Sequence, residues 1–215
     1  MKIILASASP RRKALLEKAG LIFEVIPACG EEQICLSEPW EAVMELSAAK
    51  AAEVAGSLIK GGLKGSAVII GADTVVSYKG EVLGKPKDKK DAFRMLSMLQ
   101  GERHKVYTGV TLAVLAEGGV NEHRFYEETE VGMYPMDESE IAWYIGTGEP
   151  FDKAGAYGIQ GICAMFIKEI HGSYDNVVGL PVARLYREMK KMGLPVWEGP
   201  LNTQYKKEER EYGDV

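Results

Sequence analysis

The run Ser7–Arg12 (Ser-Ala-Ser-Pro-Arg-Arg) combines hydroxyl and guanidinium groups at the expected start of a helix. The apolar stretch Lys2–Ala6 before it predicts a buried strand, and Lys13–Ala19 after it predicts a helix. A helix N-terminus presents backbone N–H groups and a positive dipole to an anion. Arg11 and Arg12 add two forked donors that suit phosphate or the acceptor edge of a base. These residue types indicate a phosphate-bearing ligand, although an ordinary strand–turn–helix with solvated arginines would have the same pattern.

Asp73 interrupts the apolar stretch Ala67–Val76, which otherwise predicts a buried strand. A buried carboxylate is costly unless it is paired or holds a metal. Asp73 is therefore a candidate cation ligand or general base. Lys85, between Gly84 and Pro86, follows a hairpin turn that folds it back towards Asp73, and this predicts a phosphate contact. The structural alternatives are a capping aspartate at a strand end and a solvated loop lysine.

The segment 148–161 is polar and rich in glycine, which lets the backbone approach a ligand closely. Its Gln160 can both donate and accept hydrogen bonds, as the reading of a base edge requires. A flexible surface loop would have a similar composition. Lys50 on an alanine-rich helical face and Glu32 in a polar loop suggest, by themselves, a snorkelling lysine and a solvated glutamate.

The apolar pattern predicts strands at 22–26, 67–76, 81–83, 106–115, 122–133 and 162–170, and helices at 40–58, from a cap at Asp88 to 99, from a cap at Asp137 to 145, and at 176–192. Ser173 predicts a helix cap, and Pro181 predicts a kink in the last helix. The middle of the chain is hairpin-like. We therefore expect an α/β fold with a mixed, twisted central sheet flanked by helices, in two lobes around a cleft.

Composition narrows the range of partners. The chain has 215 residues and a net charge of −5. It contains no basic stripe, so nucleic acid is not an expected partner. Three cysteines without a C-x-x-C pair predict reduced thiols in a cytoplasmic protein. No apolar run is long enough to span a bilayer, and the first residues lack a signal peptide, so no membrane association is expected.

Six short motifs follow one another along nearly the whole chain. They are Ser7-x-Ser9-Pro-Arg-Arg12, Gly71-Ala-Asp-Thr-Val-Val76, Leu83-Gly-Lys-Pro86, Tyr107-Thr-Gly-Val110, Tyr157-Gly-Ile-Gln-Gly161 and Asn176-Val-Val-Gly-Leu-Pro181. Each motif alone is weak, but in this order the set resembles the Maf family of nucleoside triphosphate pyrophosphatases. The resemblance extends from Met1 to about Gly193. We therefore expect one Maf-like domain at 1–195 and a charged tail at 196–215.

The resemblance implies a fold similar to the inosine-triphosphate pyrophosphatases. It also implies hydrolysis of a nucleoside triphosphate to the monophosphate and pyrophosphate, with a divalent metal cation, Mg²⁺ or Mn²⁺. The family's general base falls on Asp73, and its metal-binding carboxylates fall on Asp73 and Glu32. Its substrate-binding positions fall on Ser7, Arg11, Arg12, Lys50, Thr74, Lys85 and Gln160.

Arg11, Thr74 and Gln160 are the positions that the resemblance links to base choice. Arg11 and Gln160 are typical of the branch that acts on dTTP and UTP, whereas the branch that acts on 7-methyl-GTP typically has an aromatic residue in place of Arg11. The segment Cys29–Gln33 departs from the family pattern, with Glu31 in place of the usual Asp. The resemblance also implies a homodimer. Two alternatives stay open, a pyrophosphatase for modified nucleotides and a non-catalytic nucleotide-binding regulator of cell division.

Overall fold

The structure is a computed structural model that describes residues 1–30 and 38–196. Its strands are β1 (Lys2–Leu5), β2 (Glu24–Val25), β3 (Ala67–Tyr78), β4 (Glu81–Leu83), β5 (Arg103–Ala116), β6 (Gly119–Met133) and β7 (Ile167–His171). Its helices are α1 (Pro10–Lys18), α2 (Pro39–Lys60), α3 (Lys89–Leu99), α4 (Glu138–Gly146), α5 (Tyr174–Val178) and α6 (Val182–Lys191). Short 3-10 turns occur at η1 (Glu149–Asp152), η2 (Ala154–Ala156) and η3 (Ile162–Phe166). None of the helices in these two ranges is long and apolar enough to cross a membrane.

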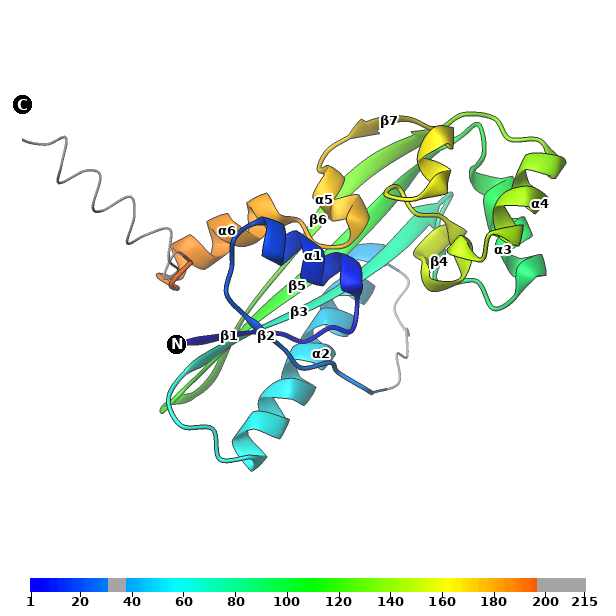
Figure 1. Ribbon diagram of the computed structural model, residues 1–215. Helices are drawn as coiled ribbons and strands as arrows, with labels where there is room; N and C mark the ends of the chain where they lie inside the picture. Colours follow the sequence, from blue (N-terminus) through cyan, green and yellow to red (C-terminus); the bar gives the residue numbers. More distant parts are fainter. Residues whose placement is uncertain (31–37, 197–215) are drawn as a thin grey trace, which may run out of the picture.

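One mixed sheet organises the molecule (Figure 1). The strand order is β2-β1-β3-β5-β6-β7, and β4 pairs with β3 beside this path. β1 runs parallel to β2 and β3, whereas the pairs β3–β5, β5–β6 and β6–β7 are antiparallel. The sheet therefore confirms the predicted mixed α/β architecture.

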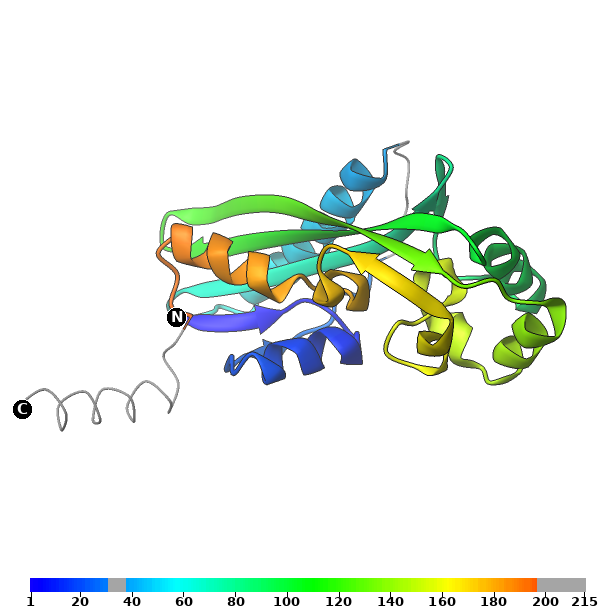
Figure 2. The ribbon, with the colours of Figure 1, turned by 90° about the horizontal axis from the view of Figure 1, so that it is seen from above.

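Alternating side chains divide the sheet into two buried faces. Val68 and Ile70 pack with Leu16 of α1 and Leu185 of α6 on one face. Ile69, between them, packs on the opposite face against α2. Figure 2, seen from above, shows α1 and α2 on different sides of the strands. Both faces of the sheet are covered, which explains the nearly continuous apolar run of β3.

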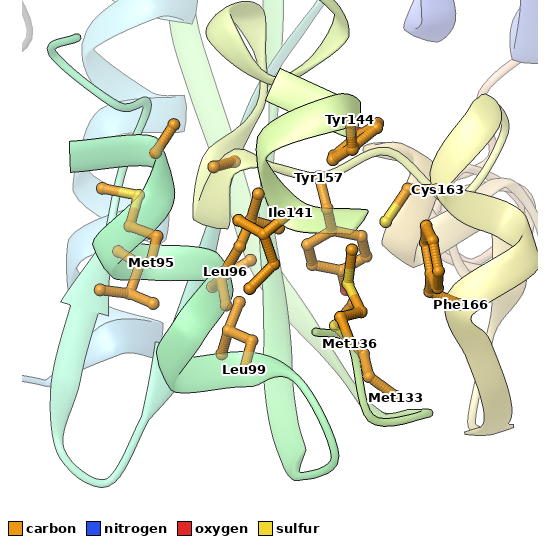
Figure 3. Packing of buried hydrophobic residues seen from close by; sticks show 14 of the residues in the cluster. Met95, Leu96, Leu99, Met133, Met136, Ile141, Tyr144, Tyr157, Cys163 and Phe166 are labelled. Carbon is orange, nitrogen blue, oxygen red and sulfur yellow. The ribbon is translucent and has the colours of Figure 1, made fainter. Parts of the chain in front are cut away.

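A second core forms at the far end of the long strands, where α3 and α4 pack (Figure 2). Figure 3 shows Tyr157 in the middle of this cluster, close to Ile141 and Met136, with Cys163 and Phe166 beyond it. This cluster is separate from the core under α1 and α6. The two cores correspond to the two predicted lobes.

The predicted caps are correct, whereas two predicted strands are wrong over part of their length. Ser9, Asp88, Asp137 and Ser173 each cap the helix that follows them, and their side chains accept a backbone N–H. The predicted strand 162–170 begins as the turn η3, and only Ile167–His171 is a strand. The predicted strand 22–26 contains only the two-residue β2.

The predicted last helix is two helices. α5 ends at Val178, the next residue, Gly179, has a φ of 126° that lies outside the helical region, and α6 begins after Pro181. A proline has no backbone N–H and clashes with the preceding turn, so the chain breaks here instead of kinking. The break brings the carbonyl of Gly179 to Arg12. The glycine-rich segment 148–161 also contains η1 and η2.

Candidate active site

A pocket lies where one edge of β3 changes partner. β5 pairs with β3 along one edge, over Ala67–Ser77. The other edge is shared by β1, which pairs with Ala67–Ile70, and β4, which pairs with Val76–Tyr78. Within the two described ranges, no strand pairs with the edge between these segments. A cavity of about 370 Å³ opens there, a size typical of small-molecule sites. Ligands of open α/β sheets commonly bind where strand connections diverge in this way.

Two glycines bring α2 unusually close to the sheet beside this pocket. A Cβ on Gly71 would clash with the backbone oxygen of Ser47, and a Cβ on Gly109 would clash with that of Val43. The hydroxyl groups of Ser47 and Thr111 are 2.8 Å apart at the same contact. Glycine is therefore required at these two positions for backbone approach, and α2 can carry its side chains to the β3 edge.

Lys50 of α2 reaches Asp73 of β3. Its Nζ donates to Asp73 Oδ1 over 2.6 Å, and the Asp73 residue is 7% exposed. Both side chains line the pocket. The pairing satisfies the buried carboxylate, as a charge in this setting requires. Lys50 therefore pairs with a carboxylate at the pocket and does not snorkel to solvent, and the substrate-binding role that the resemblance implies for it stays a prediction.

Arg12 links three parts of the pocket wall. Its Nε donates to the Gly179 carbonyl over 2.8 Å, Nη1 donates to Ser7 Oγ over 3.1 Å, and Nη2 donates to Thr74 Oγ1 over 3.0 Å. The residue is only 8% exposed. Thr74 Oγ1 is also 2.9 Å from Thr108 Oγ1. Three guanidinium nitrogens thus fix the α1 start, the β3 edge and the α5–α6 break relative to one another.

Arg11 spans the pocket to the other lobe. Its Nη1 donates to Asp152 Oδ2 over 2.7 Å, and its Nη2 donates to the Asp152 carbonyl over 3.2 Å. Lys153 Nζ donates to the other carboxylate oxygen, Asp152 Oδ1, over 2.6 Å. Desolvation raises the pKa of Asp152, but the hydrogen bonds from Lys153 and Arg11 lower it by more. The pKa of Asp152 therefore lies below its usual value. All three side chains line the pocket, so a cationic pair flanks an anion at its wall.

Tyr157 forms part of the pocket wall on the α3–α4 side. Its hydroxyl lies 2.7 Å from Nε2 of His104, whose ring is buried and 5.2 Å from the Tyr157 ring between centroids. Burial lowers the pKa of His104 to about 4, so this histidine is neutral at pH 7.

Of the residues predicted from the sequence, eight line this one pocket. They are Ser7, Arg11, Arg12, Lys50, Asp73, Thr74, Lys85 and Gln160. Lys85 and Gln160 are exposed at the pocket. Glu32 lies outside the described residues. The roles of these side chains in catalysis and binding stay predictions.

Asp152, Lys153 and Tyr157 line the pocket but were not singled out as site residues. A signal was present, because all three lie in the glycine-rich segment 148–161. Their roles depend on contacts with α1 and β5, which are distant in sequence. The local sequence pattern identifies the segment as a candidate site, but it does not show which side chains of the segment face the cavity.

The donor set of the pocket suits a hard divalent cation that also binds phosphate. Asp73 and Asp152 are the carboxylates among the described lining residues. In residues 1–30 and 38–196, no cluster of three or more His, Cys, Asp or Glu side chains could hold a metal. Mg²⁺ needs no such cluster, since it commonly takes one or two carboxylates and completes its shell with phosphate oxygens and water. The residues present fit that mode of binding.

Fold and pocket together define a mixed α/β protein with a nucleotide-sized cleft, in which basic side chains surround a buried carboxylate. The family model for Maf-like proteins matches residues 2–192, and the chain belongs to the Maf family. A dTTP/UTP pyrophosphatase of Agathobacter rectalis is 56% identical over 203 residues, with 91% of this chain and 99% of the relative covered. A dTTP/UTP pyrophosphatase of Carboxydothermus hydrogenoformans is 51% identical over 193 residues, with 90% and 100% covered.

A solved structure was also matched. It is a nucleoside-triphosphatase, a dITP/XTP pyrophosphatase, from Mycobacterium abscessus, with a TM-score of 0.30 and 17% identity. The match covers 62% of this chain and 73% of that chain.

Proposed function

We propose that this Maf-family enzyme is a nucleoside triphosphate pyrophosphatase that hydrolyses dTTP and UTP to the monophosphate and pyrophosphate. The observation that carries the proposal is the Lys50–Asp73 pair, buried beside the pocket that also collects Arg11, Thr74 and Gln160. Relatives with the name dTTP/UTP pyrophosphatase, 51–56% identical over about nine-tenths of the chain, support it.

Asp73 is placed to act on water. Lys50 holds Oδ1, and among the described residues no hydrogen bond engages Oδ2. Oδ2 can therefore accept a proton from a water molecule that attacks the α-phosphorus. The new bond joins the water oxygen to the α-phosphorus, and the bond from that phosphorus to the bridging oxygen breaks. Pyrophosphate leaves with the bridging oxygen and its electron pair, and the abstracted proton passes to solvent.

Basic groups offset the charge of the triphosphate. Lys50 on α2 and Lys85 after β4 both line the pocket. Lys50 precedes Asp73 in the sequence, and Lys85 follows it. The start of α1 adds backbone N–H groups and the positive end of its dipole. Arg12 lines the same wall, and its links to protein oxygens hold that wall in place.

Base choice falls to Arg11, Thr74 and Gln160 in this proposal. Arg11 presents a guanidinium from α1, and Gln160 presents an amide from the opposite lobe. A guanidinium and an amide together can satisfy the carbonyl and N–H edge of thymine or uracil. Thr74 acts mainly through its neighbours, since its hydroxyl contacts both Arg12 and Thr108.

We also propose a divalent cation, Mg²⁺ or Mn²⁺, as cofactor, with Asp73 as its ligand in the described chain. When bound, such a cation neutralises phosphate charge and polarises the phosphoryl oxygens. Removal of divalent metal with a chelator should abolish turnover, and Mg²⁺ or Mn²⁺ should restore it. Full activity in the presence of excess chelator would contradict this part of the proposal.

The test is pyrophosphate release by purified protein with dTTP, UTP, CTP, ITP, 7-methyl-GTP and the common purine triphosphates. Preferred turnover of dTTP and UTP, with the monophosphate as the second product, supports the proposal. Preferred turnover of 7-methyl-GTP or ITP would favour a pyrophosphatase for modified nucleotides. Binding of a triphosphate without turnover would favour a regulator of cell division. The homodimer and the cytoplasmic location stay predictions, and light scattering of the purified protein measures the first of them.

A further inference from the structure

We infer that the short segment Glu149–Lys153 is a positioning element that holds both Arg11 and Gln160 and so sets base choice. The inference rests on the proposed function, because it assigns base reading to these two side chains. They lie in different lobes, 149 positions apart in sequence, and face one pocket. The segment contacts Arg11 directly and contacts the backbone on both sides of Gln160.

The Arg11 side of the segment is a closed set of hydrogen bonds. Asp152 binds Arg11 through one carboxylate oxygen and through its own carbonyl. Its second carboxylate oxygen accepts from Lys153, which also donates to the Glu149 carbonyl over 2.6 Å. Both carboxylate oxygens of Asp152 are therefore engaged, so its orientation is fixed. A guanidinium bound at two points has its plane fixed as well as its position.

The Gln160 side depends on two glycines that flank it. A Cβ on Gly158 would clash with the Lys153 stem, and a Cβ on Gly161 would clash with the Glu149 carboxylate. The Ile162 N–H donates to Glu149 Oε2 over 2.8 Å. The backbone before Gln160 thus packs on Lys153, and the backbone after it packs on Glu149.

The segment is itself anchored in the α3–α4 lobe. The hydroxyl of Tyr144 on α4 donates to Glu149 Oε1 over 2.9 Å. Figure 3 shows Tyr144 and Tyr157 within the same hydrophobic cluster. Pro150 is buried, and Phe151 packs against this cluster. A specificity site needs such a rigid support, because small displacements of its side chains weaken discrimination.

The experiment compares base preference in Asp152→Asn, Asp152→Glu and Glu149→Gln, with Glu117→Gln as the control. Glu117 is exposed in the β5–β6 turn. The measured quantity is kcat/KM for dTTP divided by kcat/KM for ATP, with kcat and KM determined separately. We expect Asp152→Asn to lower this ratio about tenfold, the size expected for one lost hydrogen bond to a charged group. The change should arise mainly in the KM for dTTP, and Asp152→Glu should recover part of it.

Two further comparisons make the result specific. The double variant Asp152→Asn with Arg11→Ala should lower the ratio no further than Arg11→Ala alone. The two substitutions remove the same contact, the one between Arg11 and Asp152. Glu149→Gln should also lower the ratio, because Tyr144 and Ile162 donate to different oxygens of Glu149, and glutamine replaces one of these acceptors with an NH2 group that cannot accept. Melting temperatures identify a variant that fails to fold. The Asp152 side chain is 61% exposed, so its variants decide the matter if Glu149→Gln unfolds.

Failure of the inference is distinct from failure of the proposed function. If the wild-type enzyme prefers another triphosphate, the proposed substrates are wrong, and the same ratio is measured for the preferred nucleotide. If the wild type prefers dTTP and Asp152→Asn keeps the full ratio, the positioning role is overturned. A ratio that falls equally in Glu117→Gln would overturn it too.

Discussion

At the residue scale, burial of the Lys50–Asp73 ion pair costs desolvation free energy, so a contribution to stability does not by itself explain the pair. A buried ion pair is weak support for a fold, because desolvation offsets most of the attraction between the charges. Asp73 nevertheless stands in the middle of the apolar strand β3, with Lys50 only 2.6 Å from its Oδ1. The pair also lines the pocket. Its position therefore favours a role in chemistry over a role in packing.

Asp73→Asn should lower kcat for dTTP by about 10²–10⁴-fold, the usual contribution of a general base. Asparagine has nearly the same size but cannot accept the proton from water. Pyrophosphate release measures the effect, and thermal melting checks that the protein is folded. Glu117→Gln, an exposed site, should retain wild-type turnover. Full turnover by folded Asp73→Asn would contradict the assignment.

Arg12→Lys should both destabilise the protein and raise KM. The guanidinium of Arg12 donates to Gly179, Ser7 and Thr74 at once, and a single ammonium cannot span these three acceptors. The loss should be about 2 kcal/mol in the free energy of unfolding, as expected when buried hydrogen bonds to a charged group are lost. Urea unfolding measures it. Lys18→Arg, at the exposed end of the same helix, is the matched control. Equal stability of Arg12→Lys and wild type would show that the links are not needed.

At the element scale, the approach of α2 to the sheet brings Lys50 to Asp73, and Gly71 permits that approach. Gly71→Ala should lower the free energy of unfolding by about 1–3 kcal/mol, the usual cost of overpacking. It should also reduce turnover, since α2 must move away from β3. Gly56→Ala, on α2 with open space around it, should instead stabilise the helix by up to about 1 kcal/mol. If Gly71→Ala and Gly56→Ala both raised or both lowered the free energy of unfolding, this account would be contradicted.

Local signals account for the elements that the sequence predicted correctly. Asp137 caps α4 and forms a capping box with Glu140, and Asp88 caps α3, both through contacts within three residues. The wrong predictions fall where distant contacts decide. Ile162 begins a 3-10 turn, and its N–H is held by the Glu149 side chain from another turn. No local periodicity records such a contact.

The candidate site follows the same division. Asp73 was identifiable because a charge interrupts an apolar strand, and Gln160 because glycines surround it. Lys50 was identifiable only through the family resemblance, since its helix face is otherwise apolar. Asp152 was missed because its partner, Arg11, lies 141 positions away.

At the scale of the whole molecule, one buried carboxylate ties α6 to the sheet. Glu188 of α6 is 3% exposed, and His123 of β6 lies 3.0 Å from its Oε2. Arg184 and Lys191 of the same helix both donate to its Oε1, over 2.6 and 3.0 Å. Desolvation raises the pKa of Glu188, but hydrogen bonds from Lys191, Arg184 and His123 outweigh it and lower the pKa from 4.5 to about 2.

This lowered pKa makes the stability of the whole protein depend on pH in a predictable direction. A carboxylate with a depressed pKa stabilises the fold above its unfolded pKa, and the contribution is lost as pH falls through 4.5 towards 2. Glu188→Gln should lower the free energy of unfolding at pH 7 by about 2 kcal/mol, the effect of losing hydrogen bonds to a charged group. The difference from wild type should shrink by pH 3.5, because Glu188 is then largely protonated in the unfolded state while it is still charged in the folded state, and proton uptake on unfolding reduces its contribution to stability. Urea unfolding at both pH values measures it, with Glu117→Gln expected to follow the wild type at each. A difference of the same size at pH 7 and pH 3.5 would mean that Glu188 stabilises α6 by packing and not by its charge.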